Sequence, residues 1–415
     1  MRRSGTADLP LHGGRVPQWL AKRMAALGGA ITEAVVIGYG KAGFLQRLSD
    51  PHWFQAFGAV LGMDWHSSGI TTSVMGALKR SVNPMAAELG IYICGGRGKH
   101  SRKTPDELLK IGYSTGLDAT NLIRSSKLTA KVDNTAVQDG FQLYLHTFVL
   151  TDEGEWVVIQ QGMNQDSRLA RRYHWHSQNV KSFVVEPHTA VCGINQGQIL
   201  NLTAREAETA REGILAISRE RPAQLLPEIK KLVMPLHHDV REKDVDLKRL
   251  GAVIALANEQ ENLNFENLLL LQGLGPRTLQ SLALVSEVIH GTPSRFKDPA
   301  RFSFAHGGKD GHPFPVPTKV YDETIESLKE SVNKAKVGHT DKSEAIKRLH
   351  HLSVRLEKDF KPVEGGFEQL IEKERQSSWK YGGKTVFGDA TPPGSFKIEK
   401  DKKGSKGKGG QLELF

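Results

Sequence analysis

The chain has few cysteines, no long apolar run and no leader-like start. It contains only Cys94 and Cys192 and no C-x-x-C pair, which excludes a disulfide scaffold and a thiolate zinc finger and is typical of a reducing compartment. No stretch approaches the ~20 consecutive apolar residues that a membrane-spanning helix needs. Arg2 and Arg3 are not followed by an apolar segment, so no secretory signal is expected. We therefore expect a cytoplasmic, nucleoid-associated protein without membrane contact.

The composition is that of an ordinary globular chain with a positive charge excess. It has 415 residues, of which 39% are hydrophobic and 25% charged, and a length of this order suggests two to four domains. The formal net charge is +10. Such an excess favours polyanionic partners, nucleic acid first.

Two kinds of secondary-structure pattern divide the chain, and together they predict an α+β fold. The first 200 residues are typical of a mixed α/β domain. Its predicted strands are 34–37, 91–94, a hairpin of 141–150 with 156–161, 183–185 and 190–192, because these runs are rich in β-formers and bounded by turn residues.

Helical patterns replace the strands after residue 200. Thr203 to Glu206 has the spacing of a capping box, and further helices are predicted at 223–233, 244–258, 264–271 and 277–290. We assign 201–295 to a helical DNA-binding domain. A proline-rich loop with two amphipathic helices, 319–336 and 341–359, fills 296–385. The remainder, 386–415, is a lysine- and glycine-rich tail with almost nothing to bury, so disorder is expected.

Two glycine-rich segments could approach a phosphate group. Gly38, Gly40 and Gly43 fit G-x-G-x-x-G, with Asp64 further on, which on paper is a dinucleotide fingerprint. However, 44–61 predicts two helices split at Asp50-Pro51 instead of a second strand, so a plain glycine turn competes with it. The second segment is 95–103, where Arg97 and Lys99 lie among three glycines. It is either an anion-binding loop for DNA phosphate or an ordinary basic loop.

The segment 264–290 resembles the helix-hairpin-helix modules of DNA repair proteins. A short apolar helix is followed by Gly273 and Gly275, and then by a second helix that starts with Pro276. Proline suits the first helical position, and the bare N–H groups there would point at a DNA phosphate. Arg277 and Thr278 would add side-chain contacts. The competing interpretation is a turn used only for packing.

The last five residues resemble the Q-L-x-L-F peptide with which bacterial replication and repair proteins bind the sliding clamp. Leu412, Leu414 and Phe415 would enter an apolar pocket, and Gln411 would hydrogen-bond at its rim. The alternative is an end that folds back on its own domain.

A dense polar region at 124–176 is the candidate chemical centre. Asp133 and Asp139 would bind Mg²⁺ or Mn²⁺, Lys127 or Lys131 would lie near the scissile phosphate, and His146 follows on the hairpin. A metal-dependent nuclease needs such paired carboxylates and a cation, so the α/β domain, residues 1–200, is the expected nuclease domain. The competing interpretation is a hydrogen-bonded turn region in which these two aspartates only cap loops. Other pairs that could complete a metal site are Asp8 with His12, His174 with His176, and His237 with His238.

Four segments resemble a prokaryotic domain-of-unknown-function family, number 763; they are 5–14, 54–66, 130–163 and 302–310. The likeness covers about residues 1–385. It implies a DNA-associated protein with a helix-hairpin-helix and structure-selective cleavage at single-/double-strand junctions such as bubbles.

The resulting hypothesis is a divalent-metal-dependent DNA endonuclease of DNA repair that is tethered to the sliding clamp. The main alternative is a non-catalytic DNA-structure-binding factor that the clamp recruits. A nucleotide-binding oxidoreductase is a third. The sequence leaves open whether the protein is a monomer or a homodimer.

Overall fold

The computed structural model describes residues 16–63, 68–223, 247–300 and 318–359, with the short segments 384–385 and 388–389. The chain divides into two compact units, residues 1–360 and 361–415. The sequence-based boundaries at 200 and 295 therefore both fall inside the first unit. In the second unit, β9 (Lys384–Thr385) pairs antiparallel with β10 (Gly388–Asp389). Asp8, His12, Asp64, His237, His238 and the 411–415 peptide lie outside the described residues.

Within the described residues, four α-helices precede the first strand: α1 (Gln18–Ser49), α2 (Pro51–Val60), α3 (Gly69–Val82) and the short α4 (Ala86–Leu89). The predicted split at Asp50-Pro51 is confirmed. The Asp50 carboxylate accepts the backbone N–H groups of His52 and Trp53 at 2.8 and 3.1 Å, which are donors that a helix start leaves unpaired.

The predicted strand 34–37 is wrong, because these residues lie within α1. Val35 is buried there in a core shared with α3, and tertiary packing of this kind overrides the β-preference of valine. Gly40, with φ 73° and ψ 172°, kinks the same helix. The fingerprint glycines are therefore helical residues around a kink rather than a strand-to-helix loop.

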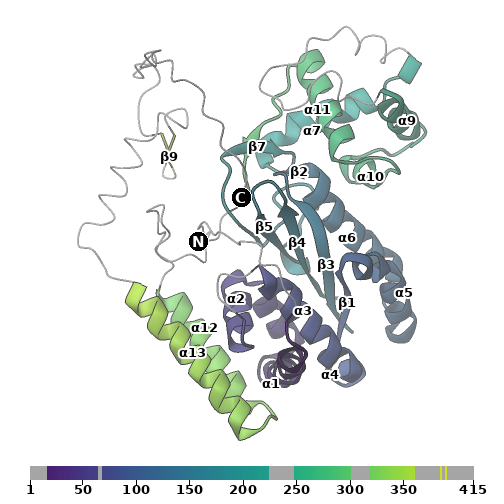
Figure 1. The fold of residues 1–415 in the computed structure, drawn as a ribbon. Coiled ribbons are helices and arrows are strands. Elements are labelled where there is room, and N and C mark those ends of the chain that lie inside the picture. Colours follow the sequence, from purple (N-terminus) through teal and green to yellow (C-terminus); the bar gives the residue numbers. More distant parts are fainter. Residues whose placement is uncertain are drawn as a thin grey trace, which may run out of the picture. The chain divides into compact units, whose positions relative to one another are not determined.

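A five-stranded antiparallel sheet forms the centre of the first unit, in the order β1-β3-β4-β5-β6 (Figure 1). Its strands are β1 (Ile91–Arg97), β3 (Gln142–Thr151), β4 (Trp156–Asn164), β5 (Leu169–His176) and β6 (Ala190–Cys192). The predicted hairpin is β3 with β4, and the predicted strands 91–94 and 190–192 are also confirmed. No strand forms at 183–185.

Both faces of this sheet are buried, each in its own hydrophobic core. Alternate side chains of a strand point to opposite faces, so Val157 and Ile159 join the core of α1, α2 and α3, whereas Trp156 and Val158 join the other. The first core also takes side chains from α12 (Thr318–Lys334) and α13 (His339–Asp359). Helices therefore cover the sheet on both sides.

The second core collects the remaining helices: α5 (Thr104–Thr115), α6 (Ala119–Lys131), α7 (Glu208–Ser218), α9 (Leu247–Asn258), α10 (Phe265–Leu270) and α11 (Pro276–His290). A π-helical turn, Val132–Ala136, extends α6. A smaller antiparallel sheet has the order β2-β7-β8, with β2 (Val137–Gln138), β7 (Gln198–Asn201) and β8 (Phe296–Lys297).

The helical predictions after residue 200 hold except at the first helix start. The helices predicted at 244–258, 264–271, 277–290, 319–336 and 341–359 are confirmed within a few residues, whereas most of 223–233 lies outside the described residues. The capping box is absent, because the Thr203 hydroxyl donates to the Asn201 side chain instead, at 2.6 Å. None of the helices among the described residues is long and apolar enough to cross a membrane.

Candidate functional site

A tight turn joins α10 to α11 and presents bare backbone. Gly273 has φ +84°, a left-handed conformation that favours glycine. Pro276 is the first residue of α11, as its missing N–H predicts. Among the described residues, the N–H groups of Gly273, Gly275 and Arg277 have no hydrogen-bond acceptor. The turn therefore offers a set of free donors at the positive end of a helix dipole.

Three carbonyl groups of the same turn accept hydrogen bonds from side chains elsewhere in the chain. Lys131 Nζ donates to the Leu274 carbonyl at 2.6 Å, Arg249 Nε to that of Gly273 at 3.1 Å, and Gln138 Nε2 to that of Pro276 at 2.8 Å. These bonds fix the conformation of the turn. They also place two cationic groups beside it.

The side chains predicted to help this turn differ in exposure. Arg277 is exposed, whereas Thr278 is only 6% exposed, so of the two only Arg277 is available to a partner. Lys131 lies at the turn rather than at a carboxylate. Burial, followed by the charge of Arg249, lowers the pKa of Lys131.

In the second glycine-rich segment, the Gly95 backbone is already bonded within the protein. Gly95 and Gly96 belong to β1, and the Gly95 N–H donates to the Glu107 carboxylate at 2.7 Å. Lys79 Nζ bonds both the Gly95 carbonyl and Glu107, each at 2.8 Å. An internal carboxylate thus occupies the position in which we expected a phosphate. Beyond β1, the segment Gly98–Lys103 is a 3₁₀ turn.

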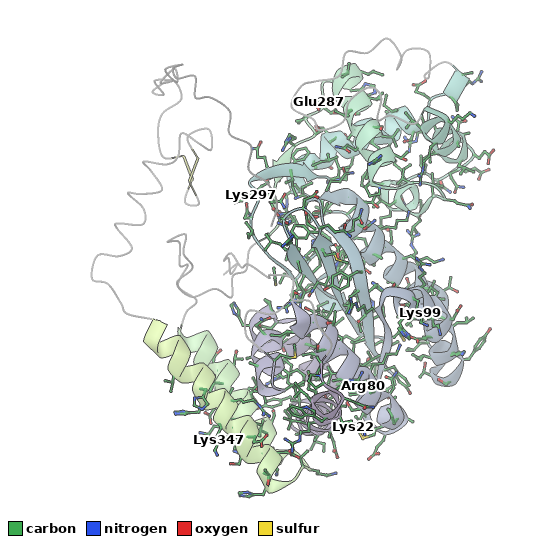
Figure 2. The ribbon with its side chains drawn as sticks, in the orientation of Figure 1. Lys22, Arg80, Lys99, Glu287, Lys297 and Lys347 are labelled. Atoms are coloured by element: carbon green, nitrogen blue, oxygen red, sulfur yellow. The ribbon has the colours of Figure 1, made fainter. Side chains whose placement is uncertain are left out.

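The cations of this segment remain on the surface. Arg97, Lys99, Arg102 and Lys103 are exposed, as Figure 2 shows for Lys99, and none of them has an acidic partner among the described residues. They are therefore available for non-specific phosphate attraction.

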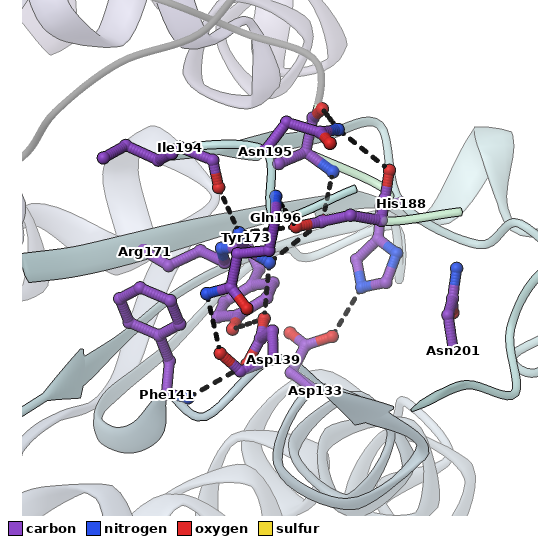
Figure 3. A network of polar contacts seen from close by, with 12 residues as sticks. Asp133, Asp139, Phe141, Arg171, Tyr173, His188, Ile194, Asn195, Gln196 and Asn201 are labelled. Atoms are coloured by element: carbon purple, nitrogen blue, oxygen red, sulfur yellow. Dashed lines mark hydrogen bonds and ion pairs between the residues drawn. The ribbon is translucent and has the colours of Figure 1, made fainter. Parts of the chain in front are cut away.

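The two candidate carboxylates are fully buried, and each has several hydrogen-bond partners (Figure 3). Asp133 Oδ2 accepts from Gln160 Nε2 at 2.5 Å and from Trp175 Nε1 at 2.9 Å, and its Oδ1 lies 2.5 Å from His188 Nε2. Burial raises the pKa of Asp133, although these three partners oppose the shift.

His146 extends this chain of contacts away from Asp133. Its Nδ1 lies 2.8 Å from Gln160 Oε1, and its Nε2 lies 2.8 Å from the Ser126 hydroxyl. Burial lowers the pKa of His146 to about 4, so the ring is neutral at pH 7. The chain of side chains from Ser126 to His188 is a satisfied internal network.

Asp139 belongs to a second network around Arg171. Arg171 donates to Asp139 at 2.9 Å and forms a bidentate pair with Asp298 at 2.8 and 3.0 Å, and all three side chains are 0% exposed. The Tyr173 hydroxyl also donates to Asp139, at 2.7 Å. Burial raises the pKa of Asp139 and that of Tyr173. The arrangement neutralises buried charge, as a structural ion-pair network does.

Comparison with known proteins gives one family. The family described as "Protein of unknown function (DUF763)" matches residues 5–316. The chain belongs to the DUF763 family. No curated protein and no solved structure matches it.

The donors described in this DUF763 protein do not fit a divalent-metal centre. No group of three or more His, Cys, Asp or Glu residues within the described ranges could hold a metal ion. Asp133 and Asp139 share their oxygens with His188 and Arg171 instead. His176 pairs with Glu155 at 2.9 Å, and burial, followed by Arg172, lowers the pKa of His174 well below its usual value.

A cavity of about 270 Å³ lies beside Asp139 and α11 in the DUF763 protein. Its walls come from the β2–β3 turn, the end of β4, the loop before β7, β7 itself, α11 and the α11–β8 connection. The lining residues are Gln138, Asp139, Gly140, Asn164, Gln196, Ile199, Leu200, Gln280 and Arg295.

Sequence reasoning missed the partners that define these networks. Arg171, Asp298 and His188 were not singled out, whereas Gln160 was noted on the strand opposite His146. A signal existed for Arg171, because a run with Arg171, Arg172 and His174 among aromatic residues places charge inside a buried strand, where it needs an acidic or polar partner.

Proposed function

We propose that this protein binds the sugar-phosphate backbone of DNA through the turn between α10 and α11. The observation that carries the proposal is the set of unpaired N–H groups at Gly273, Gly275 and Arg277. Successive bare N–H groups at a helix start form a ready-made anion site. Contacts of this kind position a protein on DNA and follow its shape, because they do not reach base edges.

The charges around the turn support a polyanion as the partner. Lys131 and Arg249 donate hydrogen bonds to carbonyl groups of the turn, and the Arg277 side chain beside them is exposed. The exposed cations at 97–103 and the net charge of +10 add long-range attraction. Since phosphate binding releases counterions, the affinity falls steeply as salt rises.

The test is an Arg277→Glu variant in a DNA titration followed by fluorescence anisotropy. We expect affinity for several unrelated duplex sequences to fall alike, by about tenfold or more, with a shallower salt dependence, because a phosphate contact is lost. Arg80→Glu is the matched control, since Arg80 is an exposed arginine on α3. Loss for one sequence alone, or an equal loss in the control, contradicts the proposal.

A second candidate is structure-selective DNA cleavage near single-/double-strand junctions. It is favoured by the position of Asp139, which lines the cavity beside the proposed DNA-binding helix α11. DNA binding is better supported than cleavage, because the carboxylates of Asp133 and Asp139 already accept hydrogen bonds from other residues of the protein.

Cleavage is tested with labelled bubble, flap and duplex DNA in Mn²⁺, Mg²⁺ or EDTA. If the candidate is correct, Asp133→Asn and Asp139→Asn abolish divalent-dependent cleavage and leave DNA affinity unchanged, with circular dichroism as the check on folding. Full cleavage by both variants places the chemistry elsewhere in the chain. No cleavage by the wild-type protein leaves DNA binding alone as its function.

A further inference from the structure

The cavity beside α11 is small and polar. Its volume of about 270 Å³ lies just below the ~300–1,000 Å³ of pockets that hold drug-sized ligands. It therefore suits one ring system rather than a longer segment of polymer. Four of its lining side chains are amides: Gln138, Asn164, Gln196 and Gln280.

These amides present hydrogen-bond donors next to acceptors. The Gln280 side chain has no hydrogen bond to another described residue. The Asn164 carbonyl oxygen accepts two backbone N–H groups at 3.0 Å, which leaves its NH₂ group available. The NH₂ groups of Gln138 and Gln196 donate to backbone carbonyls, which leaves their side-chain carbonyl oxygens available as acceptors.

The lining is less suited to other simple ligands. A divalent metal ion is commonly held by several carboxylates or imidazoles, and Asp139, the single carboxylate among the described lining residues, already accepts hydrogen bonds from Phe141, Arg171 and Tyr173. A phosphate is disfavoured, because the single cationic side chain among the described lining residues, Arg295, already donates to the Gln198 carbonyl at 2.8 Å. A purely apolar ligand would leave the amides unpaired. Ile199 and Leu200 nevertheless give the cavity an apolar wall.

We propose that this cavity binds a single unpaired nucleobase of the DNA that the α10–α11 turn holds, an inference that rests on the proposed DNA binding. A nucleobase is flat, with donors and acceptors along its edge, and glutamine and asparagine amides pair with such edges in a bidentate manner. Proteins that take up an unpaired base read it by these bonds and by apolar contact with its face.

The cavity and the turn are tied together by the same residues. Gln138 lines the cavity and bonds the Pro276 carbonyl at the start of α11. Gln280 lies four residues along the same helix, about 6 Å from Pro276 in axial rise. A nucleotide next to a phosphate bound at the turn is therefore within reach of the cavity. The ligand class is DNA with unpaired bases, such as a bulge or bubble.

The test compares a paired duplex with the same duplex carrying one unpaired base. We expect wild-type protein to bind the bulged DNA about tenfold more tightly, the scale of one good bidentate base contact. Gln280→Leu keeps the size of the side chain and removes its hydrogen bonds, and Gln280→Trp fills the cavity. Both should reduce the preference to near zero and leave the affinity for paired duplex unchanged.

Gln178→Leu, at an exposed site outside the cavity, should retain the preference. If wild-type protein shows no preference, or both Gln280 variants keep it, the cavity does not bind a base. That failure differs from failure of the proposed function, in which Arg277→Glu leaves the affinity for both DNAs intact.

Discussion

At the scale of single residues, buried charge in this protein is matched by charge or by several hydrogen bonds. Arg171 lies between Asp139 and Asp298, and Asp298 also accepts the backbone N–H groups of Gln196 and Ala300 at 2.8 and 2.9 Å. Removing one member of such a network leaves an uncompensated charge, which commonly costs about 3–5 kcal/mol. Asp139 therefore stabilises the fold whether or not it also contacts a ligand.

His146 makes the free energy of unfolding depend on pH. Burial lowers its pKa to about 4, whereas in the unfolded chain it is near 6.5. Between these values the unfolded state binds more protons, so the free energy of unfolding falls as the pH is lowered from about 6.5 to about 4. The full effect is on the order of 3 kcal/mol.

We therefore expect His146→Gln to make the free energy of unfolding less dependent on pH in this window, by up to about 1.4 kcal/mol per pH unit. The measurement is urea unfolding of both proteins at a series of pH values. Comparing the two slopes removes the contributions of Asp133 and Asp139, which both proteins share. Equal slopes would show that His146 is not held neutral by burial.

At the scale of elements, patterns carried by neighbouring residues were predictable and patterns set by distant contacts were not. The β3–β4 hairpin and the α10–α11 turn follow from local β-formers, glycines and one proline. The helical conformation of 34–37 does not follow from its local sequence, because it depends on the packing of α1 against α3. The role of Asp139 in an ion-pair network could not be predicted either, because its partner Arg171 also pairs with Asp298, which lies 127 residues further along the chain than Arg171.

Strand β1 depends on a glycine for a reason that only the packed element shows. Gly95 has φ +82°, and a Cβ there would lie 2.3 Å from the His146 backbone oxygen and 2.7 Å from the Thr104 hydroxyl. Gly98 also has positive φ, +58°, but has open space around it. The two positions therefore separate steric overlap from backbone strain.

We expect Gly95→Ala to destabilise the protein by well over the ~1 kcal/mol that an alanine at positive φ costs, because β3 has to move as well. Gly98→Ala, the control, should lose only about 1 kcal/mol. Urea unfolding measures both variants. Equal losses would mean that β3 yields easily at His146.

At the scale of the whole chain, all the described residues of both hydrophobic cores lie in the first unit, residues 1–360. The 411–415 peptide belongs to the second unit and lies outside the described residues. Its resemblance to clamp-binding peptides therefore stays a prediction. This prediction places clamp binding in the second unit, whereas the proposed DNA binding lies in the first.

Deleting Gln411 to Phe415 should abolish binding to the bacterial sliding clamp and leave DNA affinity unchanged, because a few apolar anchors supply most of the energy of such a contact. Calorimetric titration of the clamp with full-length and truncated protein measures this. Replacing the six lysines of 397–408 with glutamine is the control, which should weaken salt-sensitive DNA binding alone. Equal clamp binding by the full-length and truncated proteins, or none by either, would exclude the tether.

The pairing of Arg171 with Asp298 also sets a delay during synthesis. The two residues are separated by 127 positions, and at ~5–20 residues per second a ribosome needs about 6–25 s to add that length. For that interval the nascent sheet carries a guanidinium with only one of its two carboxylates. Arg171 can therefore gain its second carboxylate only after Asp298, the residue that follows β8, has been translated.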